Sequence, residues 1–372
     1  MISNLQAETV PYTDFACQHR GIAKEVLSAI EAVLEHGQFI NGPEVDEFEK
    51  KFAAYCGTRY AVGVGNGTDA LVLALKAVGV SRGDEVITVP NTFLSTVSAI
   101  ILAGGTPVLI DVCDDFNLNP ELLETAITAR TKAVVPVHLT GRPVRMNPIL
   151  KLAQKYGIAA IEDAAQAVGA RYYDQRVGSI GLAGCFSLHP LKNLSACGDG
   201  GILTTSDDKI YEYLIKARNH GLEDRNTCGS WGINSRLDSL QAAILLKKWS
   251  YLDAWTKARR ANARYYRKHL ANVVEVPQNT RNAYAVYHTF IIQTQYRDDL
   301  QIFLKRRGID TRIHYPVPIH LQPAARALGY RRGDFPVAER QAQTILSLPI
   351  YPELTQDQLD WVVESIHEYF ER

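Results

Sequence analysis

One lysine of the sequence lies in a setting that favours chemistry over solvation. Lys192 belongs to the stretch FSLHPLKNLSACGDGG (residues 186–201), which is largely apolar and flanked by glycines. A lysine removed from water becomes a better nucleophile toward carbonyl groups, because burial disfavours its charged form. Ser187, in the same stretch, is a candidate phosphate contact. Since most lysines are solvated surface groups, the stretch gains meaning only beside further segments.

A glycine-rich segment, GVGNGTDA (residues 63–70), stands between an expected strand and an expected helix. Backbone N–H groups of such a turn, together with the helix N-terminus, attract an anion. We therefore expect Gly67, Thr68 and Asp69 to bind a phosphate. The spacing differs from GxGxxG, so a dinucleotide fingerprint is not matched. A tight turn without a ligand is the alternative.

An acidic segment, IEDAAQ (residues 161–166), directly follows an apolar run. It places Asp163 at the carboxyl end of an expected strand, where the carboxylate can pair with a protonated ring nitrogen. At an effective dielectric of about 20, charges about 4 Å apart attract by roughly 4 kcal/mol. Gln166 can hydrogen-bond a phenolic oxygen of the same ring. The alternative is that Asp163 only caps a helix.

A fourth segment, WGINSRLDSLQA (residues 231–242), brings Asn234 to the start of a long helical stretch. Alone it indicates no more than a polar helix entry. Residues 237–270 contain neither Gly nor Pro, which predicts a long helical stretch. Because the character of the sequence changes here, we predict two domains: a large one of residues 1–248, including the N-terminal segment, and a small α+β one of residues 249–372.

Short apolar strands that alternate with helical segments must position these residues. The expected strands of the large domain are 60–63, 84–89, 107–111, 133–137, 158–161 and 201–205. Such alternation predicts a parallel or mixed sheet covered by helices, with ligands outside the carboxyl ends of the strands. The expected small-domain elements are strands at 287–294 and 309–314, a helix at 298–307 and two later helices, the last capped by Thr355.

Composition excludes several classes of function. Lys and Arg number 40, as do Asp and Glu, so no net charge attracts nucleic acid or an anionic membrane. The six cysteines include no CxxC pair, so we expect neither a metal site nor a redox pair. Sparse cysteine suits a reducing compartment, and the N-terminus is unlike a signal peptide. We expect a cytoplasmic protein without a membrane partner.

The order of these segments resembles the DegT/StrS-type sugar aminotransferases, which are pyridoxal 5′-phosphate (PLP) enzymes with the aspartate aminotransferase fold (fold type I). The matching segments are NGTDAL (66–71), TFLSTVSAI (92–100), PVHLTG (136–141), IEDAAQAVGA (161–170), FSLHPLKN (186–193), GDGG (198–201) and NSRLDSLQAA (234–243). The resemblance implies an α/β fold whose large domain holds a mainly parallel sheet between helices. It also implies a homodimer with a shared active site.

The resemblance also implies the role of each site residue. Lys192 and Asp163 match the two catalytic residues, the Schiff-base lysine and the partner of the pyridine nitrogen. The further cofactor-binding residues are Gly67, Thr68, Asp69, Phe93, Gln166, Ser187, Asn193 and Asn234. Among these, Phe93 matches the residue that stacks on the ring, and Asn234 matches a phosphate contact from the other subunit.

Three residues match positions that approach the sugar in relatives: His189, His314 and Tyr315. His189 stands where relatives more often carry tyrosine. The implied reaction moves an amino group from an amino acid, with L-glutamate expected, through pyridoxamine 5′-phosphate to a keto-sugar linked to a nucleoside diphosphate. The GDGG segment (198–201) resembles relatives that aminate C3, so we expect a 3-keto-6-deoxyhexose.

Four alternatives stay open at this point. The first is amination at C4, where relatives more often show GEGG. The second is a PLP-dependent sugar dehydratase, which carries histidine in place of the lysine, so that Lys192 argues against it. The third is a non-catalytic PLP-binding regulator, which an intact set of Lys192, Asp163 and Gln166 disfavours. The fourth is an NAD-linked enzyme with a Rossmann fold.

Overall fold

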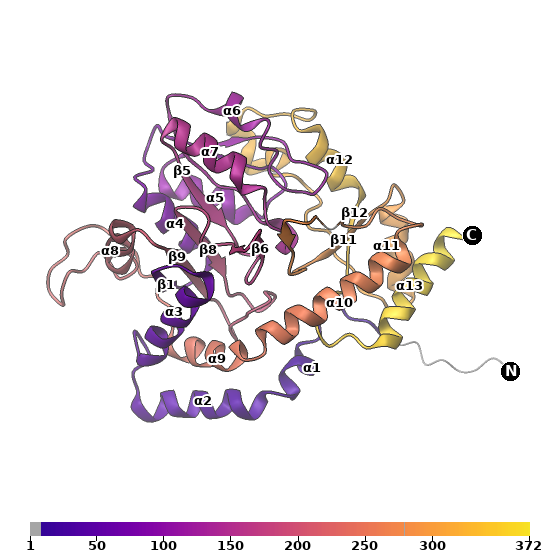
Figure 1. The fold of residues 1–372 in the computed structure, drawn as a ribbon, viewed down its shortest axis with the longest axis horizontal. Coiled ribbons are helices and arrows are strands. Elements are labelled where there is room, and N and C mark those ends of the chain that lie inside the picture. Colours follow the sequence, from indigo (N-terminus) through magenta and orange to yellow (C-terminus); the bar gives the residue numbers. More distant parts are fainter. Residues whose placement is uncertain (1–8, 279) are drawn as a thin grey trace.

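The fold is built on a mixed sheet of seven strands, seen in the computed structural model, which describes residues 9–278 and 280–372 (Figure 1). In spatial order the strands are β1 (Tyr60–Val64), β9 (Gly201–Thr205), β8 (Ala183–Ser187), β5 (Ala159–Asp163), β4 (Thr131–Val134), β2 (Glu85–Thr88) and β3 (Thr106–Leu109). Only β9 runs antiparallel to its neighbours. The predicted α/β class with a mainly parallel sheet is confirmed.

Helices cover both faces of this sheet because its strands alternate apolar side chains between them. The helices of this part are α3 (Pro43–Cys56), α4 (Gly67–Ala77), α5 (Leu94–Ala103), α6 (Leu123–Ala126), α7 (Met146–Tyr156) and α8 (Asp208–Ala217). In β8, Cys185 packs into the core formed with α4, while the next residue, Phe186, packs against α3. The ring centroids of Phe186 and Phe52 lie 4.9 Å apart.

Three helices of the chain, α1 (Phe15–Arg20), α2 (Ala23–His36) and α9 (Ser239–Trp249), lie outside the sheet. The N-terminal α1 and α2 come first, and α2 lies along α9 (Figure 1). Val26 and Val33 of α2 are buried against Ile244 and Ala243 of α9.

A small sheet joins β6 (Arg171–Tyr172) to β7 (Gln175–Arg176) and β10 (Ala283–Tyr284).

The C-terminal part packs helices around a short antiparallel pair of strands. Its elements are α10 (Leu252–Leu270), β11 (Phe290–Gln293), α11 (Arg297–Arg306), α12 (Pro336–Thr344), β12 (Ile345–Leu348) and α13 (Gln356–Phe370). The predicted cap of the last helix is confirmed, since Thr355 and Gln358 form a capping box. The domain boundary at residues 248 and 249 stays a prediction.

The predicted helical stretch is interrupted once, and one predicted strand is wrong. The stretch 237–270 forms two helices rather than one, because the N–H of Tyr251 bonds to the carbonyl of Lys248 (3.0 Å) in a tight turn after α9. Segment 309–314 makes only isolated bridges, Val10 to Ile309 and Arg312 to Ser347, because its successive residues pair with different neighbours.

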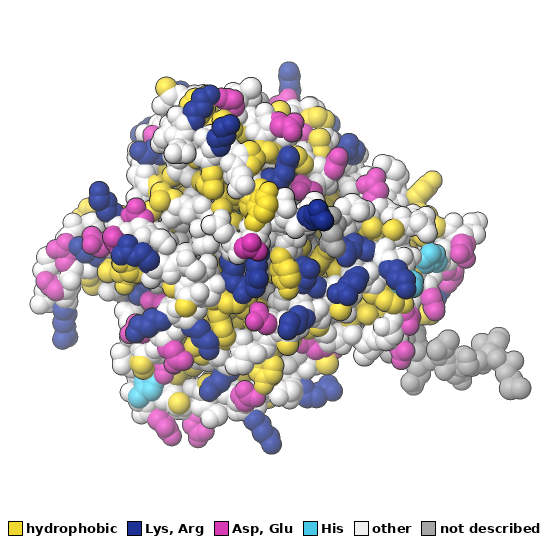
Figure 2. Space-filling model, in the orientation of Figure 1, with side chains coloured by type: hydrophobic (Ala, Val, Ile, Leu, Met, Phe, Trp, Pro, Cys, Tyr) yellow, Lys and Arg dark blue, Asp and Glu magenta, His cyan; other side chains and the backbone are white. Residues whose placement is uncertain are grey.

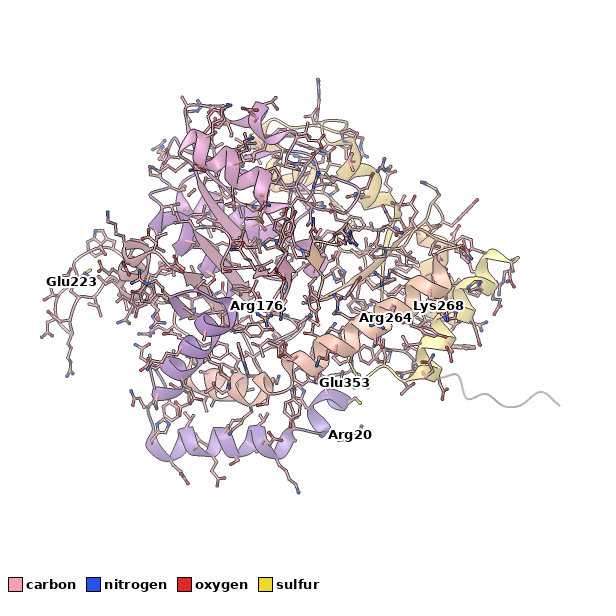
Figure 3. All side chains as sticks on the ribbon, in the orientation of Figure 1. Arg20, Arg176, Glu223, Arg264, Lys268 and Glu353 are labelled. Carbon is pink, nitrogen blue, oxygen red and sulfur yellow. The ribbon has the colours of Figure 1, made fainter. Side chains whose placement is uncertain are left out.

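A loop projects from the body after α8 (Figure 1), and Figure 3 labels Glu223 within it. Bridges between Asn219 and Asn234 and between Leu222 and Cys228 close the loop on itself. Trp231 near its end is 93% exposed.

Figure 2 shows basic and acidic side chains interspersed over one face of the molecule. Within the described ranges, no helix has the length and apolarity that crossing a bilayer requires.

Candidate active site

The predicted site residues gather at the carboxyl edge of the sheet. Asp163 is the last residue of β5, and Ser187 is the last residue of β8. Gly67 opens the helix after β1, while Phe93 immediately precedes the helix after β2. Because β1, β2, β5 and β8 run in the same direction, their carboxyl ends meet at one edge. Lys192 follows β8 on the loop that returns to β9.

Lys192 is held on a closed loop and is partly buried. Its N–H donates to the carbonyl of His189 (2.8 Å), and the ends of the loop are joined by hydrogen bonds from Leu188 to Gly200 (2.8 Å) and from Ala196 to Leu188 (2.7 Å). Burial lowers the pKa of the Lys192 amine to about 8, against the opposing charge of Asp163. A large share of this amine is therefore neutral near pH 8, as a nucleophile requires.

Asp163 is a buried carboxylate with partners on both oxygens. Thr96 on the first turn of α5 donates its hydroxyl to Oδ2 (2.8 Å), and the N–H of Ala165 donates to Oδ1 (3.1 Å). Burial raises the pKa of Asp163, while these hydrogen bonds and the nearby charge of Lys192 lower it. The helix-cap alternative is wrong, because residues 164–170 form turns rather than a helix.

The start of α4 forms the predicted cradle for a phosphate. A Cβ added to Gly67 would lie 2.9 Å from the Cβ of Ser187, so only glycine lets the two segments approach this closely. The hydroxyl of Thr68 donates to that of Ser95 (2.9 Å). The first N–H groups of a helix have no carbonyl partner within it; Asn66 engages those of Asp69 and Ala70, which leaves those of Gly67 and Thr68 for an anion.

Asp69 has hydrogen-bond partners on both its N–H and its carboxylate. Its N–H donates to the side chain of Asn66 (2.9 Å), and its carboxylate accepts from the hydroxyl of Ser235 (2.6 Å). The hydroxyl of Ser235 also accepts from the N–H of Gly65 (2.9 Å). These contacts support the cradle, and Asp69 stays a predicted cofactor contact. Asn234, next to Ser235, is exposed at the base of the projecting loop.

Gln166 links the sheet edge to the C-terminal part of the chain. Its Oε1 accepts from the N–H of Thr140 (2.7 Å), and its Nε2 donates to the hydroxyl of Tyr315 (3.2 Å). The ring of Tyr315 lies 5.6 Å from that of Phe93, centroid to centroid. The structure thus brings Phe93, Gln166 and Tyr315 together. Burial raises the pKa of the Tyr315 hydroxyl, which keeps it neutral.

Two histidines near Lys192 are neutral because they are buried. Nδ1 of His314 lies 2.9 Å from the hydroxyl of Ser347. Burial, with the charges of Lys192 and Arg312, lowers the pKa of His314 to about 4. The pKa of His288 is lowered for the same reasons, burial first and the charge of Lys192 second.

The other two predicted contacts are held differently. His189 is exposed, and its Nδ1 accepts from the N–H of Leu191 (3.3 Å). Asn193 is buried, and its amide donates to the carbonyl of Val286 (3.1 Å), so it anchors the loop of Lys192. Both stay predicted contacts of a ligand.

Sequence reasoning missed Thr96 and His288, since each acts through a contact with a distant part of the chain. For Thr96 a signal did exist: it lies inside the segment TFLSTVSAI (92–100), three residues after Phe93 and so on the same face of a helix start. His288 stands outside every matched segment, and only the folded chain places its imidazole close enough to Lys192 for their charges to interact.

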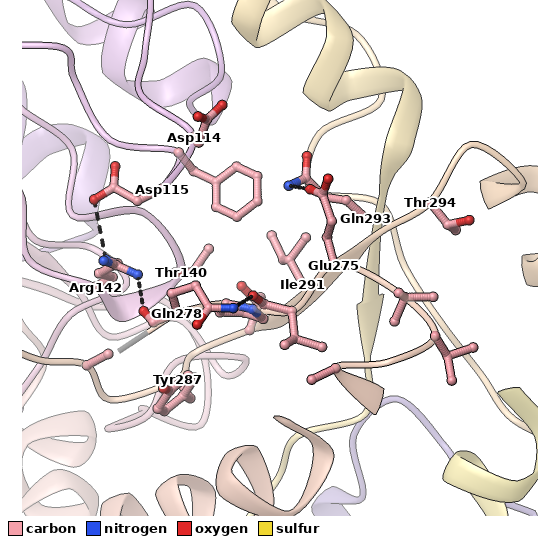
Figure 4. A pocket seen from close by; sticks show the side chains of 18 of the residues that line it. Asp114, Asp115, Thr140, Arg142, Glu275, Gln278, Tyr287, Ile291, Gln293 and Thr294 are labelled. Atoms are coloured by element: carbon pink, nitrogen blue, oxygen red, sulfur yellow. Dashed lines mark hydrogen bonds and ion pairs between the residues drawn. The ribbon is translucent and has the colours of Figure 1, made fainter. Parts of the chain in front are cut away.

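A cavity of about 870 Å³ lies elsewhere, between the loop after β3 and the C-terminal part (Figure 4). Asp115, Arg142 and Glu275 contribute polar groups, and Arg142 pairs with Asp115 (3.4 Å). Thr140 borders the cavity, but Lys192 is not among the residues that line it. The reacting groups therefore do not coincide with this cavity, although ligand sites often do.

Comparisons with known proteins agree with this geometry. A model of the DegT/DnrJ/EryC1/StrS aminotransferase family matches residues 20–367. A dTDP-3-amino-3,4,6-trideoxy-alpha-D-glucose transaminase of Streptomyces venezuelae is 41% identical over 375 residues, which cover 100% of this chain and 99% of that protein. A protein of Geobacillus stearothermophilus that is named a pleiotropic regulatory protein is 42% identical over 366 residues, covering 97% of this chain and 98% of its own.

Two solved structures share the fold. One is DesV of S. venezuelae in complex with a ketimine intermediate, with a TM-score of 0.96 and 42% identity over 98% of this chain and 99% of that one. The other is a Bacillus subtilis protein, NtdA, with bound pyridoxamine phosphate, with a TM-score of 0.88 and 31% identity over 94% of this chain and 82% of that one.

Proposed function

Because the chain belongs to the DegT/DnrJ/EryC1/StrS aminotransferase family, we propose that it moves an amino group from L-glutamate to a 3-keto-6-deoxyhexose linked to a nucleoside diphosphate. One observation carries the proposal: the partly buried amine of Lys192 and the buried carboxylate of Asp163 share one edge of the sheet. The name of the S. venezuelae relative and the GDGG segment (198–201) both favour amination at C3 over C4.

The residues of the site fit pyridoxal phosphate, the cofactor of this enzyme. Lys192 offers the amine that holds it, and the Gly67 cradle, whose Cβ space faces Ser187, suits its phosphate. Phe93 is half exposed and suits stacking on the cofactor ring, and Asp163 suits a protonated ring nitrogen. When bound, the cofactor supplies an electron sink for breaking a bond at the Cα of the amino acid.

Lys192 is the proposed general base. With a pKa of about 8, its Nζ can take the proton from the Cα of the donor and give it up again near neutral pH. Asp163 keeps its charge within the site because Thr96 and Ala165 donate hydrogen bonds to it. Gln166 and Tyr315 fix hydrogen-bonding groups beside the ring of Phe93. Together these residues orient the bond that breaks.

We also propose that two copies share each active site in a symmetric dimer in the cytoplasm. Large apolar side chains beside the site support this, since Phe93 is 52% exposed, Leu94 50% and Leu191 44%. Apolar surface of this kind commonly marks an interface. The exposed side chain of Trp231 on the projecting loop also supports an interface. Asn234 at the base of that loop is the proposed phosphate contact of the neighbouring site.

The first test measures the two halves of the reaction separately. Glutamate added to the protein loaded with pyridoxal phosphate should bleach its visible absorbance, and a panel of keto-sugar nucleotides should then restore it. Borohydride should fix the cofactor on Lys192, as peptide mapping would show. Absorbance that glutamate leaves unchanged would instead support a regulator, which the name of the G. stearothermophilus relative keeps in view. The NAD alternative is wrong, because the cofactor is pyridoxal phosphate.

The second test asks whether sites are shared. Lys192→Ala and Asn234→Ala proteins are unfolded and refolded together in equal amounts, so that about half of the dimers are mixed. In a mixed dimer, one site combines an intact Lys192 with the partner's intact Asn234, so about a quarter of wild-type activity should return. Activity that stays at the level of the parents would place Asn234 in its own chain's site. The design requires that Asn234→Ala alone be severely impaired.

A further inference from the structure

A second lysine is buried away from the reacting groups. Lys248 in the last turn of α9 is 0% exposed. Its Nζ lies 3.4 Å from the hydroxyl of Ser195 and 3.7 Å from Sγ of Cys197. No carboxylate of the described residues forms an ion pair with it. A buried ammonium without a counter-charge is costly, and burial lowers the pKa of Lys248 toward the neutral amine.

Cys197 presents a thiol to this amine while remaining open to solvent. It lies on the loop that runs from Lys192 to β9 and is exposed. Its backbone is clamped to α9, because its N–H donates to Oε1 of Gln241 (2.8 Å) and its carbonyl accepts from Nε2 of the same residue (3.4 Å). Nε2 of His19 lies 3.9 Å from Sγ on another side. The clamp holds the thiol and the amine face to face.

The other cysteines lack this combination. Cys56 and Cys185 are buried, and burial raises the pKa of each thiol, which makes them unreactive. Cys228 is exposed like Cys197, but the polar atoms near its Sγ are the carbonyls of Ser230 (3.0 Å) and His220 (3.5 Å). Cys228 is therefore a matched control: an exposed thiol held against carbonyl oxygens instead of an amine.

We propose that a peroxide joins Cys197 to Lys248 through a covalent sulfur–nitrogen bond. In the first step the thiol attacks hydrogen peroxide: the O–O bond breaks, sulfur is oxidised to a sulfenic acid, and one water leaves. In the second step the neutral amine of Lys248 attacks that sulfur: the S–N bond forms, the S–O bond breaks, and the hydroxyl leaves with an amine proton as a second water. Overall, one thiol, one amine and one peroxide give one cross-link and two waters.

The cross-link would tie the loop that follows Lys192 to α9. Because the clamp by Gln241 already holds the backbone of Cys197 at this position, the bond needs little movement. A small thiol attacking the sulfur releases the amine and forms a mixed disulfide, and a second thiol restores Cys197. The modification is thus reversible, and it requires neither substrate nor cofactor turnover.

The test is peptide mass spectrometry on the full-length protein after brief treatment with hydrogen peroxide, removal of the peroxide with catalase and alkylation of free thiols. We expect a linked pair of peptides, containing Cys197 and Lys248, that is lighter than their sum by two hydrogen atoms and disappears after dithiothreitol. Cys197→Ser and Lys248→Met should each abolish it, whereas Cys228→Ser should leave it unchanged. In Lys248→Met, dimedone should instead trap the sulfenic acid on Cys197.

Three results would overturn the proposal. One is native protein in which Cys197 is oxidised to sulfenic or sulfinic acid while Lys248 stays unmodified. Another is a link from Cys197 to a residue other than Lys248. The third is a linked pair that carries an additional oxygen atom, because the bond would then not be a direct one between sulfur and nitrogen. Since Cys197→Ser keeps the buried lysine in place, it tests the proposal even if Lys248→Met fails to fold.

Discussion

The sheet edge and segment 314–315 both border the site, but the surroundings of their polar groups differ. The charged form of Asp163 has partners at the sheet edge, whereas burial favours the neutral forms in segment 314–315. At the sheet edge, burial raises the pKa of Asp163, while two hydrogen-bond donors and the nearby charge of Lys192 oppose that rise by favouring the charged form. In segment 314–315, burial lowers the pKa of His314 to about 4 and raises that of Tyr315, so both are neutral. We therefore propose that charge and proton transfer belong to the sheet edge, and hydrogen bonding and shape to the other side.

The largest effect should follow from removing the amine at the sheet edge. Lys192→Ala should abolish turnover, because both the anchor of the cofactor and the general base are lost. The Gly67 cradle remains, so the protein should still bind the cofactor without a covalent bond. Steady-state assays and borohydride trapping measure the two effects. Turnover in the variant, or an adduct at a different lysine of the native protein, would contradict the assignment.

Asp163→Asn should come next. It removes the charge but keeps the shape and the capacity to accept from Thr96, so the fold should survive. We expect the glutamate half-reaction to slow by several orders of magnitude, because the ring nitrogen is no longer held protonated. Stopped-flow absorbance measures the rate, and circular dichroism serves as the folding control. A rate near that of the native protein would reduce Asp163 to a structural acceptor.

Variants of segment 314–315 should be milder and selective. Tyr315→Phe removes the hydroxyl that accepts from Gln166 while keeping the ring beside Phe93. We expect about a tenfold loss, the usual scale of one hydrogen bond, in the sugar half-reaction and little change in the glutamate half-reaction. His314→Asn should follow the same pattern. Equal damage to both half-reactions would indicate a structural role for the segment and remove the contrast between the two regions.

The free energy of unfolding should change with pH in opposite directions for a titrating group in each of the two regions. The pKa of His314 is about 4 in the folded chain and ordinarily 6.5, so the unfolded chain binds more protons between these values. Stability from this group is therefore fully present above pH 6.5 and is lost as the pH falls toward 4, by about 3 kcal/mol at most. Asp163, whose pKa is raised, acts in the opposite direction. Urea unfolding of the native and His314→Asn proteins across this range isolates the histidine; parallel profiles would refute its contribution.

The sequence predicts the sheet better than the connections around it. Its strands are apolar runs bounded by glycine or proline, so the expected strand 201–205 coincides with β9 and the expected 84–89 encloses β2. The break after α9 has no such mark, because it depends on local turn hydrogen bonds at Tyr251. The failed strand 309–314 shows that a strand-like pattern also needs a continuous neighbour.

The site divides in the same way. Residues whose chemistry is specific, such as Lys192 and Asp163, could be singled out from residue type and position. Supporting residues are harder to find: Thr96 has a signal only in its place within the segment 92–100, while its contact with Asp163 and the burial of His288 near Lys192 appear only in the folded chain. Asp69 was placed correctly at the helix start, but the sequence does not reveal that Asn66 and Ser235 already engage its polar groups.

The hydrogen bond between Asp69 and Ser235 connects the region proposed to bind the cofactor with the region proposed to form the dimer. It ties the phosphate cradle to the base of the projecting loop, the loop proposed to reach the neighbouring subunit. Any free energy by which cofactor binding favours the dimer must equal the free energy by which dimer formation favours cofactor binding. If the proposed dimer is coupled to the cofactor in this way, dilution should weaken cofactor binding as the subunits separate, and cofactor depletion should loosen the dimer.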